Sequence, residues 1–148
     1  DEAVERAYAH VAAILDGLEA DTVILFLDEP ALGHAGFDYR GMWAPIFSSF
    51  RVTPGVHTCG SMNWDELFES GVTYVSFDAS QFDVTAYPGY RGGKRIAWGV
   101  QRREDVRDFR PGDLLTLPCG MGSQLYTADD CEKNLALLDV IAGGVAPA

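Results

Sequence analysis

Short apolar runs alternate along the chain with segments of helical periodicity. Residues 2–18 place apolar side chains three and four positions apart, with charged residues between them, which predicts an amphipathic helix. Residues 22–27 then form an almost continuous apolar run that stops at Asp28, as expected for a strand buried on both faces. A helix followed by a buried strand is the first indication of an α/β fold.

Four more strand-like runs follow the first one. The strands are predicted at residues 55–59, 72–77, 95–100 and 113–117. Helices are predicted at residues 63–71, 103–109 and 127–144, where Gly143–Gly144 ends the last of them, whereas residues 33–39 are predicted as a loop and residues 81–94 as a loop or a poorly formed helix. Repeated strand-then-helix units imply a parallel sheet with helices packed outside it.

The length of the chain leaves two arrangements of these units open. With 148 residues, the chain is one domain at most. An open, doubly wound sheet fits this length, whereas a complete (β/α)8 barrel typically needs about 250 residues. A barrel therefore requires that its remaining strands come from sequence outside these residues or from another chain, because five strands cannot close it and would leave sheet edges to be covered.

Charge and composition exclude several classes of function. Eleven Lys and Arg residues stand against 22 Asp and Glu residues, so the formal charge is −11, which argues against nucleic acid or an anionic membrane surface as the main partner. No apolar run approaches the roughly 20 residues that span a bilayer, and no targeting segment is recognisable at the N-terminus, so we expect a soluble cytoplasmic protein. The cysteines, Cys59, Cys119 and Cys131, are too few for a disulfide scaffold, which favours metal binding or free thiols.

Polar side chains gather at the points where the predicted strands end. They are Asp28, Glu29, His57, Cys59, Asp78, Gln101 and Cys119. In parallel α/β folds, the carboxyl ends of the strands meet at one edge, which is where ligands and catalytic groups lie. One site at that edge is therefore expected to collect most of these side chains.

The same residues suggest a metal site. His57 and Cys59 are two positions apart on a strand, so their side chains project from the same face, and Cys119 follows another strand. Two thiolates and an imidazole are ligands that zinc prefers, and three protein ligands leave a fourth position for substrate or water. Asp78 would complete the coordination or orient the ligands. The alternative is a buried cysteine pair beside a histidine that hydrogen-bonds the backbone.

The order of the motifs resembles a known family. The chain carries Leu-Asp-Glu-Pro-Ala-Leu at residues 27–32, then His-Thr-Cys at 57–59, then a strand ending in a carboxylate, then Pro-Cys-Gly-Met-Gly at 118–122. This order resembles the catalytic C-terminal domain of cobalamin-independent methionine synthase, whose superfamily of barrels includes uroporphyrinogen decarboxylase and corrinoid-dependent methyltransferases. From about residue 22 to the last helix, the resemblance implies the C-terminal part, about five strands, of a TIM-type (β/α)8 barrel.

The resemblance also implies the ligands of a zinc ion. They would be His57, Cys59 and Cys119, with Asp78 standing where the family has a glutamate. Pro118 directly precedes Cys119, without the aspartate that usually separates the two in the family. The shorter side chain of Asp78 leaves open a site of three ligands, as in the corrinoid-dependent methyltransferases.

The resemblance places substrate-binding residues beside this metal. Asp28 would face the amino group of a thiol amino acid, with Glu29 next to it, although both carboxylates also suit a simple turn after the strand. Gln101 stands where the synthases tend to have an acidic residue. Cys131, in the first turn of the last helix, is interpreted as a buried structural thiol.

The function implied is that of a zinc-dependent methyltransferase related to methionine biosynthesis. It would activate a thiol, homocysteine or a similar one, for methyl transfer from a methylated folate or a methyl-corrinoid. One alternative is a decarboxylase resembling uroporphyrinogen decarboxylase, which would want a basic lining for its substrate carboxylates. Another is a non-catalytic metal- or thiol-binding half-barrel that pairs with a second copy, with another subunit or with a missing N-terminal half.

Overall fold

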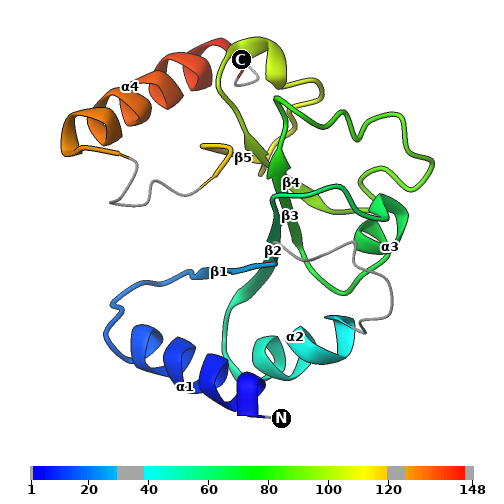
Figure 1. Ribbon diagram of the computed structural model, residues 1–148, viewed down its shortest axis with the longest axis vertical. Helices are drawn as coiled ribbons and strands as arrows, with labels where there is room; N and C mark the ends of the chain where they lie inside the picture. Colours follow the sequence, from blue (N-terminus) through cyan, green and yellow to red (C-terminus); the bar gives the residue numbers. More distant parts are fainter. Residues whose placement is uncertain (1, 30–38, 120–125, 146–148) are drawn as a thin grey trace.

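The computed structural model describes residues 2–29, 39–119 and 126–145 (Figure 1). The elements run in the order α1 (Glu2–Asp16), β1 (Ile24–Asp28), α2 (Tyr39–Ser49), β2 (Thr53–Thr58), α3 (Trp64–Phe68), β3 (Tyr74–Asp78), β4 (Arg95–Gly99), the 3-10 helix η1 (Arg103–Asp105), β5 (Leu114–Thr116) and α4 (Ala128–Val145). Across these described ranges, no helix is both long and apolar enough to cross a membrane.

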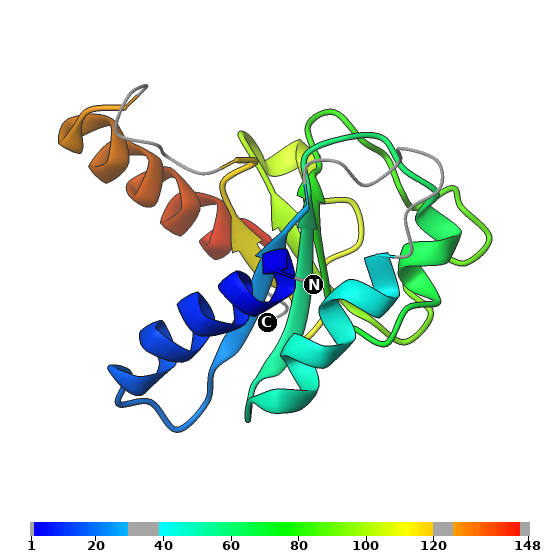
Figure 2. The ribbon, with the colours of Figure 1, turned by 60° about the horizontal axis from the view of Figure 1, so that its bottom comes forward.

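The described strands form one parallel sheet in the order β1-β2-β3-β4-β5. A doubly wound sheet reverses its strand order at a switch point, and no such reversal occurs among these strands. The fold is therefore mixed α/β, with parallel βα units wound in a single direction. The sheet curls as a half-barrel between α1, beside the β1 edge, and α4, beside the β5 edge (Figures 1 and 2).

The register gives the sheet two chemically different faces. Asp28 lies opposite His57, His57 opposite Ser76, and Ser76 opposite Ala97, so these positions share one face. The intervening residues point to the other face, which α2 and α3 cover. The buried apolar side chains of that second face and its helices are Trp43, Val56, Trp64, Leu67, Phe68, Val75, Phe77, Ile96 and Trp98. The core thus lies outside the curl, and the inner face carries the polar side chains of Asp28, His57 and Ser76 beside the aromatic rings of Phe26 and Tyr74.

Two connections lack the helix that a complete βα unit would have. Residues 81–94 form turns, and the helix predicted at residues 103–109 is wrong beyond its first turn, since η1 ends at Asp105. The Asp105 carboxylate accepts hydrogen bonds from the backbone N–H groups of Gln101 and Arg102, which fixes this turn. Beyond it, the Arg107 side chain donates to the carbonyl oxygen of Ala79 at 2.8 Å, and this long-range partner draws the chain away from a helical path.

The helices differ in other ways from those predicted. The hydrophobic pattern did not indicate α2, because Gly41 and Pro45 interrupt it, yet Trp43 and Ile46 of this helix are buried. The last helix continues through Gly143 and Gly144 to Val145, since glycine weakens a helix without ending it and Ile141 anchors the final turns in the core.

A buried ion pair ties the β3–β4 connection to the start of β5. Arg91 donates from Nη1 and Nη2 to the two carboxylate oxygens of Asp113, at 2.9 and 2.7 Å, and from Nε to Asp108 at 3.0 Å. Asp113 also accepts from the Ile96 N–H at 2.9 Å and from the Trp98 indole at 3.1 Å. The carboxylate is therefore saturated with donors, as burial of a charge requires.

This ion pair predicts a loss of stability in acid. Burial alone would raise the pKa of Asp113, but hydrogen bonds from Arg91, the Ile96 N–H and the Trp98 indole outweigh burial, so the pKa is lowered. A lowered folded-state pKa contributes stability that is present above the unfolded-state value of about 3.9 and is lost as pH falls below it. We expect urea midpoints measured at pH 7, 5 and 3 to drop mainly in the last step, and to drop less in an Arg91→Met variant.

Candidate functional site

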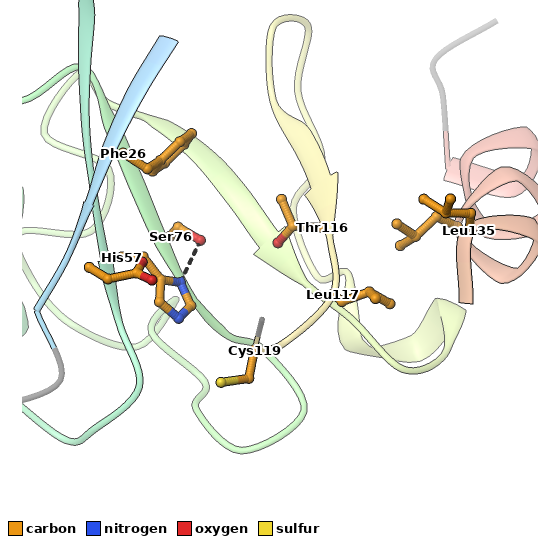
Figure 3. Close-up of a pocket in the computed structure, with 9 residues that line it drawn as sticks. Phe26, His57, Ser76, Thr116, Leu117, Cys119 and Leu135 are labelled. Atoms are coloured by element: carbon orange, nitrogen blue, oxygen red, sulfur yellow. Dashed lines mark hydrogen bonds between the residues drawn. The ribbon is translucent and has the colours of Figure 1, made fainter. Parts of the chain in front are cut away.

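Three of the predicted metal-binding side chains meet at the carboxyl edge of the sheet. His57 lies on β2, Cys59 just after it, and Cys119 shortly after β5. The Cys59 Sγ atom is 3.3 Å from His57 Nε2 and 3.9 Å from Cys119 Sγ. Figure 3 shows the Cys119 side chain directed from the end of β5 toward the His57 ring. The fold therefore brings together donors that are 60 positions apart in the chain.

The donor set and its spacing fit zinc. Tetrahedral zinc, with Zn–S near 2.3 Å and Zn–N near 2.0–2.1 Å, separates two thiolates by about 3.8 Å and a thiolate from an imidazole nitrogen by about 3.5 Å. The distances from Cys59 are close to both values. Among the described residues, no three or more His, Cys, Asp or Glu side chains already surround a common point as a complete metal site would. Adjustment of the two exposed cysteine side chains would be needed to enclose an ion.

Ser76 fixes the orientation of His57. Its Oγ lies 2.9 Å from His57 Nδ1, and both side chains are buried. When Nδ1 carries the ring proton and donates it to Ser76, the lone pair of Nε2 points toward Cys59, which is the arrangement that metal-binding histidines use. Ser76 was not among the residues predicted from the sequence. Its position opposite His57 in the register is the signal that identifies it.

The surroundings of Cys59 favour a bound cation. Burial raises the pKa of this thiol, the neighbouring Cys119 thiol raises it further, and the carboxylates of Asp28 and Asp78 add to the effect. In the absence of a positive charge, the thiol is therefore held in its neutral form. A divalent cation would oppose these influences and favour the thiolate.

Asp78 is close to this site, but its carboxylate is occupied. One oxygen accepts from the backbone N–H and the hydroxyl of Ser80, at 2.9 and 2.6 Å, and the other accepts from the Gln81 amide. These bonds turn the carboxylate toward its own loop. We therefore expect Asp78 to affect a cation bound here only through its charge, and direct coordination by Asp78 stays a prediction.

Two cavities border Cys119. One, of about 360 Å³, lies on the inner face of the sheet and is lined by Phe26, Asp28, His57, Ser76, Thr116, Leu117, Cys119, Leu135 and Leu138 (Figure 3). The other, of about 600 Å³, is lined by Asp78, Gln81, Val100, Gln101, Leu117, Pro118, Cys119, Tyr126, Asn134 and Leu137. Asp28 thus lines the first and Gln101 the second. None of these described lining residues is a lysine or an arginine.

Glu29 lines neither of these two cavities. It lines a third cavity, of about 260 Å³, on the side of β1 that carries α1 and α2, where burial raises its pKa. Its backbone N–H donates to the carbonyl oxygen of His57 at 2.9 Å, which extends the pairing of β1 with β2. The structure therefore separates Glu29 from the two cavities at Cys119. Residues 30–32 and 120–122 of the two motifs, like residues 33–38, lie outside the described ranges.

Gly99 allows the Cys119 segment to approach the sheet. A Cβ atom at this position would lie 2.9 Å from the Pro118 Cα and 2.5 Å from the Phe77 carbonyl oxygen. Both are backbone atoms, so neither can move without shifting a strand or the segment that carries Cys119. The glycine is thus a requirement of the site as well as of the sheet.

A Gly99→Ala substitution should test this requirement. We expect it to weaken zinc binding at least about tenfold and to lower the free energy of unfolding by about 1–3 kcal/mol, because an overpacked site must displace its neighbours. Metal titration and urea unfolding would measure the two effects. Gly71→Ala is the control, since nothing lies within 4 Å of its Cβ position. Equal zinc affinity and equal free energy of unfolding in the two variants would contradict the role of Gly99.

Comparisons of this chain with protein-family models, with curated proteins and with solved structures found no match.

Proposed function

We propose that this chain belongs to a zinc-dependent methyltransferase that activates a thiol as methyl acceptor. The observation that carries the proposal is the contact of Cys59 with both His57 and Cys119 at the carboxyl edge of a parallel sheet. These three residues would hold the metal, leaving a fourth position for the substrate. Zinc bound there would lower the pKa of the substrate thiol and favour its nucleophilic thiolate form.

The side chains around the metal ligands have distinct roles in this proposal. Ser76 holds His57 in the ring orientation that directs Nε2 toward the cysteines. Asp28, which shares the inner face with His57, would accept a hydrogen bond from the ammonium group of an aminothiol. Its carboxylate lines the same cavity as Cys119, so thiol and ammonium would bind together.

The second cavity at Cys119 is the proposed place of the methyl donor. Gln101 and Gln81 offer amide groups there, beside the Asp78 carboxylate. The donor would be a methylated folate or a methyl-corrinoid. Its methyl group would pass to the sulfur as the bond to nitrogen or cobalt breaks with its electron pair, and the thiol proton would leave to solvent.

We further propose that the sheet is part of a TIM-type (β/α)8 barrel. The consecutive order of five parallel strands supports this, and so does the position of the site at their carboxyl ends. Among the described strands, β1 and β5 each pair with a single neighbour. These free edges favour a second candidate function, a non-catalytic metal- or thiol-binding half-barrel that pairs with another subunit. A decarboxylase is not supported, because the described residues lining the two cavities include no lysine or arginine to bind substrate carboxylates.

Zinc analysis combined with a transfer assay tests the proposal. The purified chain would be loaded with zinc under reducing conditions, and methyl transfer to homocysteine, 2-aminoethanethiol or 2-mercaptoethanesulfonate would be followed with methyltetrahydrofolate or methylcobalamin as donor. We expect about one zinc per chain and methylated thiol with at least one donor. Zinc without transfer to any of these thiols would favour the non-catalytic half-barrel. Absence of zinc would refute both metal-dependent functions.

A further inference from the structure

Among the described residues, Cys59 and Cys119 form a pair of neighbouring thiols. Their sulfur atoms are 3.9 Å apart, and both side chains are exposed. Each lies in a bend beyond the end of its strand, so neither is held by the ladder of the sheet. A disulfide needs a sulfur separation of about 2.05 Å, which requires the two atoms to approach by about 1.9 Å. Side-chain rotation and small shifts of two bends are the movements available for this.

We propose that Cys59 and Cys119 are a reversible oxidation site, which forms an intramolecular disulfide when the metal-free chain meets a peroxide. The disulfide would join the end of β2 to the segment after β5, and β2 and β5 are not neighbours in the sheet. Cys131, the remaining cysteine, lies half-buried in α4 and has no place in this reaction.

The reaction balances with hydrogen peroxide as oxidant. One thiol gives its proton to solvent, and its thiolate attacks a peroxide oxygen, so that the O–O bond breaks, hydroxide leaves and a sulfenic acid forms. The second thiolate attacks the sulfenic sulfur, the S–O bond breaks, and a second hydroxide leaves. The two hydroxides take up the two thiol protons as water. Two sulfur atoms together lose two electrons, and the two peroxide oxygens gain them.

The disulfide would exclude the proposed metal. Zinc binds thiolates, and both cysteine ligands would be consumed by the bond. Conversely, bound zinc would hold the two thiolates and slow their oxidation. The oxidation site itself depends only on the geometry of the cysteines and does not require that the chain transfer methyl groups.

Peptide mapping of the oxidised chain tests this inference. The reduced, metal-free Cys131→Ser protein would be treated with hydrogen peroxide, and its free thiols and mass followed. We expect both thiols to be lost together, the mass to fall by two hydrogen atoms, and a Cys59–Cys119 peptide to appear that dithiothreitol releases. The rate should not depend on protein concentration. Circular dichroism of the oxidised chain would show that it remains folded.

Other outcomes would overturn the proposal. Sulfinic acids on separate cysteines would show that Cys59 and Cys119 do not form an intramolecular disulfide. Disulfides between chains, formed at a rate that rises with protein concentration, would show the same. Cys59→Ser and Cys119→Ser variants in the same background are the matched controls, because each keeps one thiol and can give only such products. Zinc binding without disulfide formation would refute this inference and leave the proposed function standing. A disulfide in a chain that binds no zinc would support this inference and refute the proposed function.

Discussion

Zinc should fall from about one ion per chain to nearly none when Cys119 is replaced by serine or His57 by alanine. Each substitution removes one of three donors, and the loss of a ligand is expected to weaken zinc binding by more than the roughly 10–100-fold that the loss of a hydrogen-bonding partner costs. The ligands come from the ends of two strands held in one sheet, and the carboxylate of nearby Asp78 already accepts hydrogen bonds from Ser80 and Gln81. Elemental analysis after reconstitution, with titration against a competing chelator, would measure the effect.

Two further variants serve as controls for this result. Cys131→Ser removes a thiol that lies in α4, away from the cavities at Cys119, and should bind zinc as the unmodified chain does. Asp78→Asn keeps the size of a side chain whose oxygens already accept from Ser80 and Gln81, and we expect it to retain the metal. Full zinc content in both the His57 and Cys119 variants would show that the ion is not bound at this edge of the sheet.

Arg91→Met should destabilise the chain by about 3–5 kcal/mol, because it would leave the buried carboxylate of Asp113 without its positive partner. The two side chains are joined by two hydrogen bonds, and their exposed fractions are only 7% for Arg91 and 1% for Asp113. The free energy of unfolding, from urea denaturation at pH 7, would measure the loss. The metal site should keep its ligands, since the ion pair lies away from them.

An exposed ion pair of the same segment provides the comparison. Arg110 bonds to Asp108, and the exposed fractions of these side chains are 56% and 32%. Arg110→Met should therefore cost no more than about 1 kcal/mol, since exposed ion pairs contribute little. If the Arg91 and Arg110 variants lost the same stability, burial of the Arg91–Asp113 pair would not be the source of its contribution.

The strands were the part of the fold that the sequence predicted best. All five lie within two residues of their predicted bounds. For β1, β3 and β4 the reason is a mainly apolar run, which is common in the strands of a parallel sheet. The connections were predicted less well. Whether residues 103–109 form a helix depends on Asp105, which binds its own turn, and on Arg107, which binds Ala79 in another connection. The hydrophobic pattern contains no information about such partners.

The candidate site was likewise predicted only in part. The position of His57, Cys59 and Cys119 at strand ends was sufficient to predict that they would lie together, because the carboxyl ends of parallel strands share an edge. The contribution of Ser76 depends on the register between β2 and β3, and that of Gly99 on the approach of Pro118. Glu29 and Asp28 both line the cavity beside α1 and α2, but of the two only Asp28 also lines the inner-face cavity that contains His57 and Cys119.

The consecutive strand order also indicates how the chain should open. Each described strand pairs with the described strands next to it in sequence, and burial is complete along β3 but partial along β1 and β5. Amide hydrogen exchange should therefore be slowest in β3 and faster toward both edges, since edge strands can detach without disrupting the rest. Cys119 follows the edge strand β5, whereas His57 lies on β2, next to the slowest strand. Release of a bound ion would then need only a fluctuation at one margin of the domain, on a timescale far shorter than that of global unfolding.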